Sequence, residues 1–357
     1  MSELITKLDD IIWGVPLIVL ILGCGVILTV RFGGVQFKRL GLALRFMVKN
    51  EESGDGDISS FGALCTALSA TIGTGNIVGV ATAIAVGGPG ALFWMEIAAL
   101  FGMATKYAEG FLAIKYRIDT PDGSKLGGPF YYIETGMGKR FTLLAKLFAL
   151  FGMLAGLLGI GTITQISGIV SASNGFFNGD SGRKLTLFGS SYSLVTVITG
   201  IIITLFAGLV IIGGIKNISK VSSIVVPFMA VLYILCTVNI MITNIDKIPA
   251  AAGEIIKGAF GLKPIGGATV GGTMILAMQK GVARGIFSNE AGLGSAPIAA
   301  AAAKTKDTVR QGLVTMTGTF IDTICICTMT GLSIVISGAW QDSSLEGVEI
   351  TTAAFKY

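Results

Sequence analysis

Eight apolar stretches, each long enough to cross a lipid bilayer, constrain this chain more than any other feature of its sequence. A helix needs about 20 apolar residues, each rising about 1.5 Å, to cross the roughly 30 Å of hydrocarbon. Only 13% of the residues are charged, whereas a soluble protein carries about 25%. The chain is therefore expected to be an all-α polytopic membrane protein, with spans near residues 11–30, 61–86, 89–114, 143–171, 193–213, 221–242, 265–303 and 311–337.

Composition excludes several kinds of chemistry. The chain has no histidine, so histidine-based acid–base catalysis, catalytic triads and histidine metal sites are ruled out. Ser295, in the motif GLGSAP, has no histidine to activate it and lies in no G-x-S-x-G motif. We therefore expect no enzymatic activity. The cysteines lie in apolar stretches without the spacing of zinc ligands and are expected to be small core residues: Cys24, Cys65, Cys236, Cys325 and Cys327.

Lysine and arginine are concentrated in alternate connections between the apolar stretches. The connections after the first, third, fifth and seventh stretches hold 15 of them, whereas the N-terminus and the other connections hold 6. Cytoplasmic loops of membrane proteins carry such an excess, so we expect the N-terminus to lie outside the cytoplasmic membrane. The same loops account for the net charge of +5, and we expect no nucleic-acid partner.

The second apolar stretch contains residues that neither a helix nor lipid favours, since residues 69–79 read SATIGTGNIVG. One interpretation is close helix packing through the G-x-x-x-G pair Gly75 and Gly79. A dinucleotide fingerprint fails, because Val78 stands where the third glycine should be and no βαβ unit surrounds it. The third interpretation is a helix unwound at the membrane midplane. Its free N–H groups would bind an anion and its free carbonyls a cation, as in leucine-transporter-type symporters.

The seventh stretch is also interrupted. Its apolar halves flank QKGVARGIFSNEAG at 279–292, which carries Lys280, Arg284 and Glu290. A second broken span is therefore expected. The neighbouring sequence ATVGGTM at 268–274 resembles a potassium-channel filter, but a channel would need four such loops around one axis.

Four long motifs point to a known family: GTGNIVGVATAIAVGGPGALFWM (73–95), FGMATKYAEG (101–110), GVARGIFSNEAGLGSAPIAAAAAKT (281–305) and MTGTFIDT (316–323). From Trp13 to the C-terminus the chain resembles the alanine or glycine:cation symporter family. The resemblance implies a five-plus-five inverted-repeat fold of the leucine-transporter type with one extra N-terminal helix.

The resemblance also implies a division of the chain. Residues 1–57 would hold the extra helix and a cytoplasmic loop, 58–242 the first repeat with its first span broken at 71–76, 243–264 an external loop, and 265–357 the start of the second repeat. That second part would contain the broken span 265–303, the span 311–337 and the beginning of a further helix. Since the sequence ends there, we expect about three spans to be missing, the second repeat to be incomplete and the sequence to be part of a longer protein.

The family's binding residues map onto both breaks. The resemblance implies substrate contacts from Thr71, Gly73, Thr74, Gly75, Asn76, Gln165, Phe287 and Ser288, and sodium contacts from the backbone carbonyls of Ser69 and Ile72.

Each of several positions also has a plainer interpretation. The Ser69 hydroxyl could bond back to its own helix, Gln165 could form an interhelical hydrogen bond, and Phe287 could be core packing. Arg284 and Glu290 would fit a gate or a structural ion pair. Asp322 is an intramembrane carboxylate that could act directly or orient Thr319 or Thr323. Glu96 replaces the family's usual tryptophan and could snorkel or pair with Lys106.

The resemblance implies sodium-coupled import of alanine or glycine by alternating access, with sodium as coupling ion and the bilayer as surrounding partner. A proton-coupled small amino-acid transporter is the alternative, and an ion channel is a third possibility.

Overall fold

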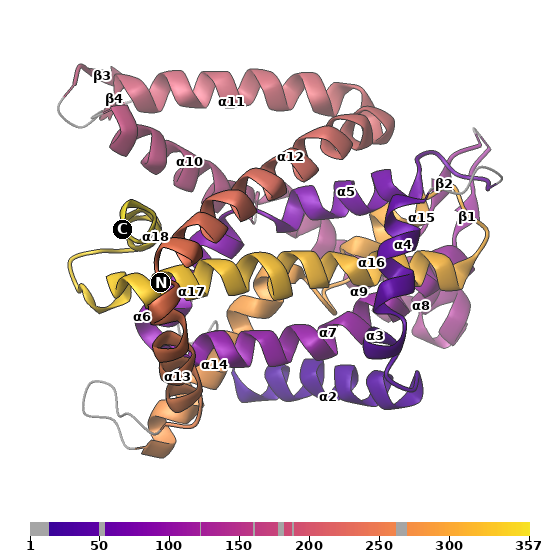
Figure 1. Cartoon of the computed structure of the whole chain (residues 1–357). Coiled ribbons are helices and arrows are strands. Elements are labelled where there is room, and N and C mark those ends of the chain that lie inside the picture. The colour runs from indigo at the N-terminus through magenta and orange to yellow at the C-terminus, as the bar shows by residue number, and fades with distance from the viewer. Residues whose placement is uncertain are drawn as a thin grey trace.

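The computed structural model describes residues 14–49, 54–121, 123–159, 161–177, 182–187, 189–261 and 270–357. Helices dominate these residues, which confirms an all-α polytopic membrane protein (Figure 1). The strands in the described part form two short antiparallel hairpins. They pair β1 (Ile118–Asp119) with β2 (Lys125–Leu126) and β3 (Lys184–Leu187) with β4 (Ser190–Ser193).

The helices follow the predicted apolar stretches. In chain order these are α2 (Val15–Arg31), α5 (Ser60–Thr71) with π-helix η1 (Gly75–Gly79) and α6 (Val80–Gly87), α7 (Gly90–Lys115), α9 (Thr142–Leu157) with α10 (Thr162–Phe177), α11 (Leu194–Ile212), α12 (Gly214–Thr243), α14 (Val270–Asn289) with α15 (Ala296–Ala301), and α16 (Thr308–Thr319) with π-helix η5 (Phe320–Cys327) and α17 (Thr328–Ser337). Short helices connect them: α3 (Val35–Lys38), α4 (Leu40–Val48), α8 (Pro129–Met137), η2 (Lys139–Phe141), η4 (Ile245–Lys247), α13 (Ile248–Ala259), η6 (Ala339–Gln341) and α18 (Val348–Lys356).

Two predicted elements differ from the structure in detail. The stretch 143–171 consists of two helices, α9 and α10, which together still form one candidate span and are separated by a short interruption, where Gly159 and Gly161 have positive φ angles of 64° and 87°. Glycine adopts such angles without steric cost. The connection 243–264, expected as an external loop, contains α13. This helix is tied to α7, because Trp94 Nε1 donates to the Ala259 carbonyl at 2.9 Å.

The connections sort to two ends of the helix bundle, which runs horizontally in Figure 1. The β1–β2 hairpin, α4, α8 and α15 lie at one end, whereas the β3–β4 hairpin, α13 and α18 lie at the other. The connections 31–60 and 115–142, which contain α4, the β1–β2 hairpin and α8, hold five lysines and arginines each, whereas the connections 172–192 and 243–264 at the other end hold two and three. The arrangement therefore agrees with the alternation on which the predicted orientation depends.

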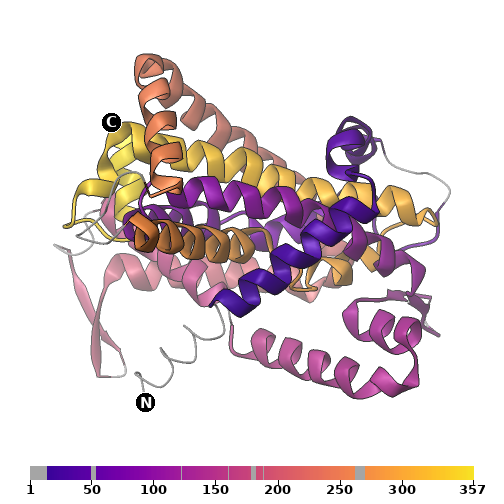
Figure 2. The ribbon, with the colours of Figure 1, turned by 90° about the horizontal axis from the view of Figure 1, so that it is seen from below.

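Helix α7 occupies the centre of the bundle and packs against α2, α14 and α16. Figure 2 shows α2 (indigo) lying obliquely across the bundle. Glycines permit these close contacts: a Cβ at Gly25 would lie 2.9 Å from the Phe101 carbonyl oxygen, and one at Gly281 only 2.1 Å from the Ala91 carbonyl oxygen. Small residues at helix interfaces are typical of membrane proteins, since lipid supplies no hydrophobic force to press helices together.

Helix α11, in contrast to α7, lies at the surface of the bundle. None of its 19 residues is buried, and Leu205, Phe206 and Leu209 are each more than 60% exposed. An apolar face of this size is unfavourable in water and favourable against hydrocarbon. We therefore expect α11 to contact lipid tails.

Candidate functional site

The first broken span is interrupted at the position that its glycines and threonines predict. Helix α5 ends at Thr71, helical structure resumes at Gly75, and the two halves are bent by 52°. The side chain of Asn76 closes the gap, because its Oδ1 accepts from Gly73 N at 2.8 Å while Asn76 N donates to the Gly73 carbonyl at 3.2 Å. The observed break lies inside the predicted range 71–76.

Two glycines let other helices approach this break. A Cβ at Gly73 would lie 2.5 Å from Gln165 Oε1, and one at Gly75 would lie 3.3 Å from Ser288 Cα. Gln165 of α10 also donates from Nε2 to the Ala70 carbonyl at 3.3 Å. The interhelical hydrogen bond considered for Gln165 is thus present, and it holds α10 against the end of α5.

A buried hydrogen-bond cluster surrounds Asp322. Asn76 Nδ2 donates to Asp322 Oδ1 at 2.8 Å and to the Asp322 carbonyl at 3.0 Å. Ser288 Oγ donates to Asp322 Oδ2 at 2.9 Å, and Thr323 Oγ1 donates to the same oxygen at 2.8 Å. Asp322 is 1% exposed. The cluster joins three elements, η1, α14 and η5, that are distant in sequence.

Both π-helices of the described chain contribute to this cluster. Asn76 lies in η1, and Asp322, Thr323 and Cys327 lie in η5. Cys327 Sγ lies 3.3 Å from Asn76 Nδ2 and 3.6 Å from Ser288 Oγ. A π-helical turn widens the hydrogen-bond ladder and is frequent at functional sites. The unusual backbone therefore coincides with a buried cluster of polar side chains.

The cluster has the donor chemistry of a site for a hard cation. A buried carboxylate is costly unless another charge or strong hydrogen bonds compensate it. The carboxylate oxygens of Asp322 and the hydroxyl oxygens of Ser288 and Thr323 are hard ligands of the type that sodium accepts. The intramembrane carboxylate was the sequence signal for this position, but its partners could not be read from the sequence.

The expected sodium carbonyls lie elsewhere, in the last turn of α5 and just beyond it. Ser69 Oγ donates to the Thr66 carbonyl at 2.7 Å, so the ordinary back-bond considered for this side chain is present. Ile72 is the C-cap of α5 and has extended backbone, with φ −74° and ψ 106°. Sodium binding by the Ser69 and Ile72 carbonyls stays a prediction.

A large cavity opens beside the first break on the side of α18. Its volume is about 780 Å³. It is bordered by Thr74 and Gly75 of the break, by Ser167 and Gly168 of α10, and by Phe287 of α14, together with the loop before α18. Thr74, Gly75 and Phe287 therefore share one cavity, whereas Gly73, Asn76 and Ser288, each next in sequence to one of these residues, do not line it.

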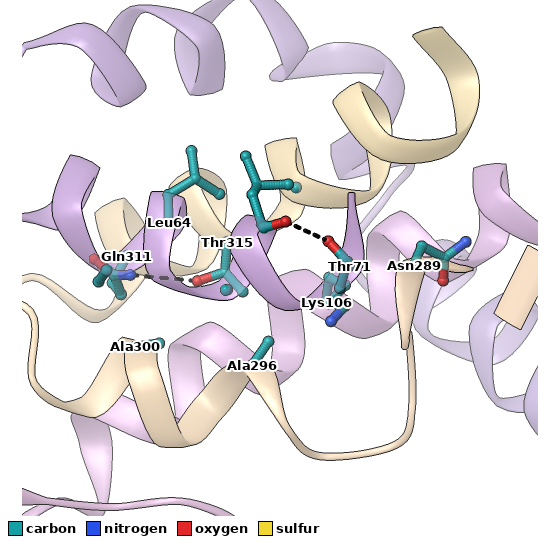
Figure 3. Close-up of a pocket in the computed structure, with 12 residues that line it drawn as sticks. Leu64, Thr71, Lys106, Asn289, Ala296, Ala300, Gln311 and Thr315 are labelled. Atoms are coloured by element: carbon teal, nitrogen blue, oxygen red, sulfur yellow. Dashed lines mark hydrogen bonds between the residues drawn. The ribbon is translucent and has the colours of Figure 1, made fainter. Parts of the chain in front are cut away.

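Thr71 does not border the large cavity. It borders a second, small cavity of about 20 Å³, together with Lys106, Asn289, Gln311 and Thr315 (Figure 3). That volume holds about one water molecule. We call the large cavity, bordered by Thr74, Gly75 and Phe287, the outer cavity and the small one, bordered by Thr71, the inner cavity. The expected substrate residues are thus divided between the two cavities and positions that line neither.

The second break begins later than the sequence indicated. Phe287 and Ser288 still lie in the last turn of α14, which ends at Asn289, and α15 begins at Ala296. Glu290, the first residue of the break, has a positive φ of 54°, which is rare outside glycine. The interruption therefore lies at 290–295.

The charged residues near this break have partners other than those considered from the sequence. Arg284 lies over the Phe287 ring, with 5.9 Å from its guanidinium carbon to the ring centroid, while Glu290 accepts a hydrogen bond from Ser295 Oγ. Glu96 hydrogen-bonds to Thr328, and its Oε1 is buried without a hydrogen-bond partner.

Comparisons with known proteins match the sequence of this chain along its whole length. The model of the sodium:alanine symporter family matches residues 1–357. The chain is 52% identical over 354 residues to an uncharacterized transporter of Haemophilus influenzae, covering 99% of this chain and 74% of that protein. It is 47% identical over 363 residues to the sodium/alanine symporter AgcS of Methanococcus maripaludis, covering 99% and 75%. It is 38% identical over 348 residues to the probable sodium/glutamine symporter GlnT of Bacillus subtilis, covering 97% and 68%.

Proposed function

Since this chain belongs to the sodium:alanine symporter family, we propose that it imports alanine or glycine together with sodium across the cytoplasmic membrane. The observation that carries this proposal is the buried Asp322 cluster, which lies directly behind a break that borders an open cavity. A cation site and an amino-acid site in contact can be filled together. Such contact is what coupling two solutes in one transport cycle requires.

The substrate carboxylate is assigned to the start of η1. The backbone N–H groups of Thr74 and Gly75 begin a helical segment that borders the outer cavity, and the N-terminal end of a helix attracts negative charge. The remaining substrate contacts are proposed from the surrounding residues, Thr71, Gly73, Asn76, Gln165, Phe287 and Ser288.

Sodium is assigned to two positions. The first is the oxygen set of Asp322, Ser288 and Thr323, where a monovalent cation would compensate the buried carboxylate. The second comprises the carbonyls of Ser69 and Ile72 at the C-terminal end of α5, where the helix dipole favours positive charge. No covalent chemistry is needed for either step.

Transport itself is proposed to follow alternating access in a five-plus-five inverted-repeat fold with its N-terminus outside. The first repeat would comprise residues 58–242 and the second would begin at residue 265. A membrane potential of 100 mV contributes about 2.3 kcal/mol per charge and a tenfold sodium gradient about 1.4 kcal/mol more. One sodium ion could thus support accumulation of a few hundredfold, since about 1.4 kcal/mol corresponds to a factor of ten.

The test is alanine binding by the purified protein in sodium and in potassium. Alanine should bind much more tightly in sodium, and Asp322→Asn should remove most of that difference, because the amide carries no charge to hold the cation. Asp342→Asn, an exposed aspartate beyond α17, is the control and should behave like the wild type. Equal alanine affinity in sodium and potassium would refute sodium coupling.

Proton coupling is the second candidate, because Glu96 Oε1 is buried and lacks a hydrogen-bond partner. A protonated carboxyl at this position would carry the coupling charge in place of sodium. In that case a pH gradient without sodium should drive alanine uptake, and Glu96→Gln should abolish this dependence. Alanine uptake that depends on the sodium gradient and does not change with the pH gradient would exclude proton coupling.

A further inference from the structure

Arg117, just beyond the end of α7, joins two chain segments that are far apart in sequence. Its Nη1 donates to the Ala301 and Ala303 carbonyls at 3.2 and 2.8 Å. Its Nη2 donates to the Asp55 and Thr305 carbonyls, both at 2.8 Å. One guanidinium thus holds the segment that leads into α5 against the segment that leaves α15. The planar fork of arginine suits such a set of acceptors, which a single ammonium group cannot satisfy.

The two segments are also paired directly. The amides of Asp57 and Ile58 donate to the Ala302 carbonyl at 2.9 and 3.1 Å, and Ile58 forms a parallel β-bridge with Ala303. Side chains are excluded from this contact, because a Cβ at Gly56 would lie 2.5 Å from the Ala303 backbone. Backbone therefore packs on backbone. We call this contact between residues 54–58 and 302–305 the seam, and it is closed to solutes.

The small inner cavity lies between this seam and the Asp322 cluster. Thr71 and Asn289 border it at one end, and Asn289 Nδ2 donates to Thr323 of the cluster at 3.0 Å. Gln311, near the start of α16, borders it at the other end, and its Oε1 lacks a hydrogen-bond partner. The buried Lys106 also borders the cavity, beside Thr71 (Figure 3). Polar groups thus lie at both ends of this cavity, which is lined by residues of α5, α7, α15 and α16 and lies between the cation cluster and the seam.

We propose that Arg117 holds the inner end of the transport path shut, acting as a positioning residue on the segments 54–58 and 302–305. The assignment rests on the proposed transport function. It specifies which residues control the release of substrate and ion into the cytoplasm. When the four carbonyl contacts and the direct backbone pairing of the two segments separate, α5 is freed from α15, and the inner cavity joins the cytoplasmic solution. The outer cavity is already open in this structure, so the closed inner seam and the open outer cavity form the two ends of one pathway.

The test measures access to the inner cavity directly. Ala67 lines this cavity from α5, and Ala67→Cys is placed in the full chain after replacement of the five native cysteines. The rate of reaction with a membrane-impermeant thiol reagent is then measured from each side of the membrane. Arg117→Ala should raise the rate from the cytoplasmic side by at least about tenfold, because four hydrogen bonds that favour the closed state are lost.

Comparing the labelling rates from the two sides of the membrane distinguishes a gating role of Arg117 from a general structural role. In an Arg117→Ala background, a cysteine introduced as Ser167→Cys in the outer cavity should react more slowly from outside, since opening one end closes the other. The matched control is Lys115→Ala, which removes an exposed cation from the last turn of α7 that contacts the Phe111 and Tyr116 rings and no carbonyl of the seam. It should leave both rates unchanged.

If Arg117→Ala does not fold, Arg117→Lys takes its place in the test. Arg117→Lys should also raise the rate at which Ala67→Cys reacts from the cytoplasmic side, by a smaller factor. The proposal is overturned if the folded Arg117 variants react at the wild-type rate, or if Lys115→Ala raises the rate equally. The labelling needs neither alanine nor sodium. A wild type that binds alanine without regard to sodium would therefore refute the proposed function while the labelling rates still decide the role of Arg117.

Discussion

Asn76 Nδ2 lies 2.8 Å from Asp322 Oδ1, a hydrogen bond between residues 246 positions apart. Asn76 also accepts from Gly73 N through its Oδ1, so one amide side chain connects the broken backbone to the buried carboxylate. Binding or release of a cation at Asp322 would therefore alter the hydrogen bonds of Asn76 and, through them, the backbone at the break. This short connection gives a physical route for coupling ion and substrate.

Gly75→Leu should abolish alanine binding without preventing membrane insertion. Even a Cβ at this position would lie 3.3 Å from Ser288 Cα, and a leucine side chain would fill the space assigned to the carboxylate. The matched variant is Gly152→Leu in α9, because no atom of another segment lies within 4 Å of its Cβ position and Gly152 does not line the cavity. Alanine affinity is measured by equilibrium binding, and wild-type affinity in Gly75→Leu would place the substrate elsewhere.

Gln165→Ala should weaken alanine binding by more than about 1 kcal/mol, the typical net contribution of one hydrogen bond. The Gln165 side chain lies against the break, with Oε1 close to Gly73 and Nε2 bonded to the Ala70 carbonyl. Asn174→Ala on the same helix is the control, since Asn174 bonds to Ser193 and Thr196. An unchanged dissociation constant with a lowered melting temperature would assign Gln165 to helix packing alone.

Gly281→Ala should destabilise the protein by roughly 1–3 kcal/mol, the usual range for overpacking a tight interior. The added Cβ would lie 2.1 Å from the Ala91 carbonyl oxygen and would force α14 away from α7. Gly23→Ala in α2 is the control, because no atom lies within 4 Å of its Cβ position. Thermal unfolding in detergent measures both variants, and equal melting temperatures would show that α14 is not tightly held against α7.

The sequence alone determined the features that depend on local composition. Apolar length predicts the spans, because each helix satisfies its own backbone hydrogen bonds and its side chains partition into lipid independently of distant residues. The glycines and threonines at 71–76 likewise predict the first break, since poor helix formers weaken the helix in which they lie. The four long motifs identified the family, and the match of the family model over residues 1–357 confirms it.

Tertiary structure alone decided which polar groups meet. Nothing near Asp322 in the sequence specifies Asn76 as its partner, and nothing near Arg117 specifies the carbonyls of Asp55 and Thr305. The second break was placed too early because the charged residues of 279–292 interrupt hydropathy without interrupting the helix, which continues to Asn289. Such pairings depend on how closely helices approach and in which direction their side chains point, and neither quantity is encoded in a local window of residues.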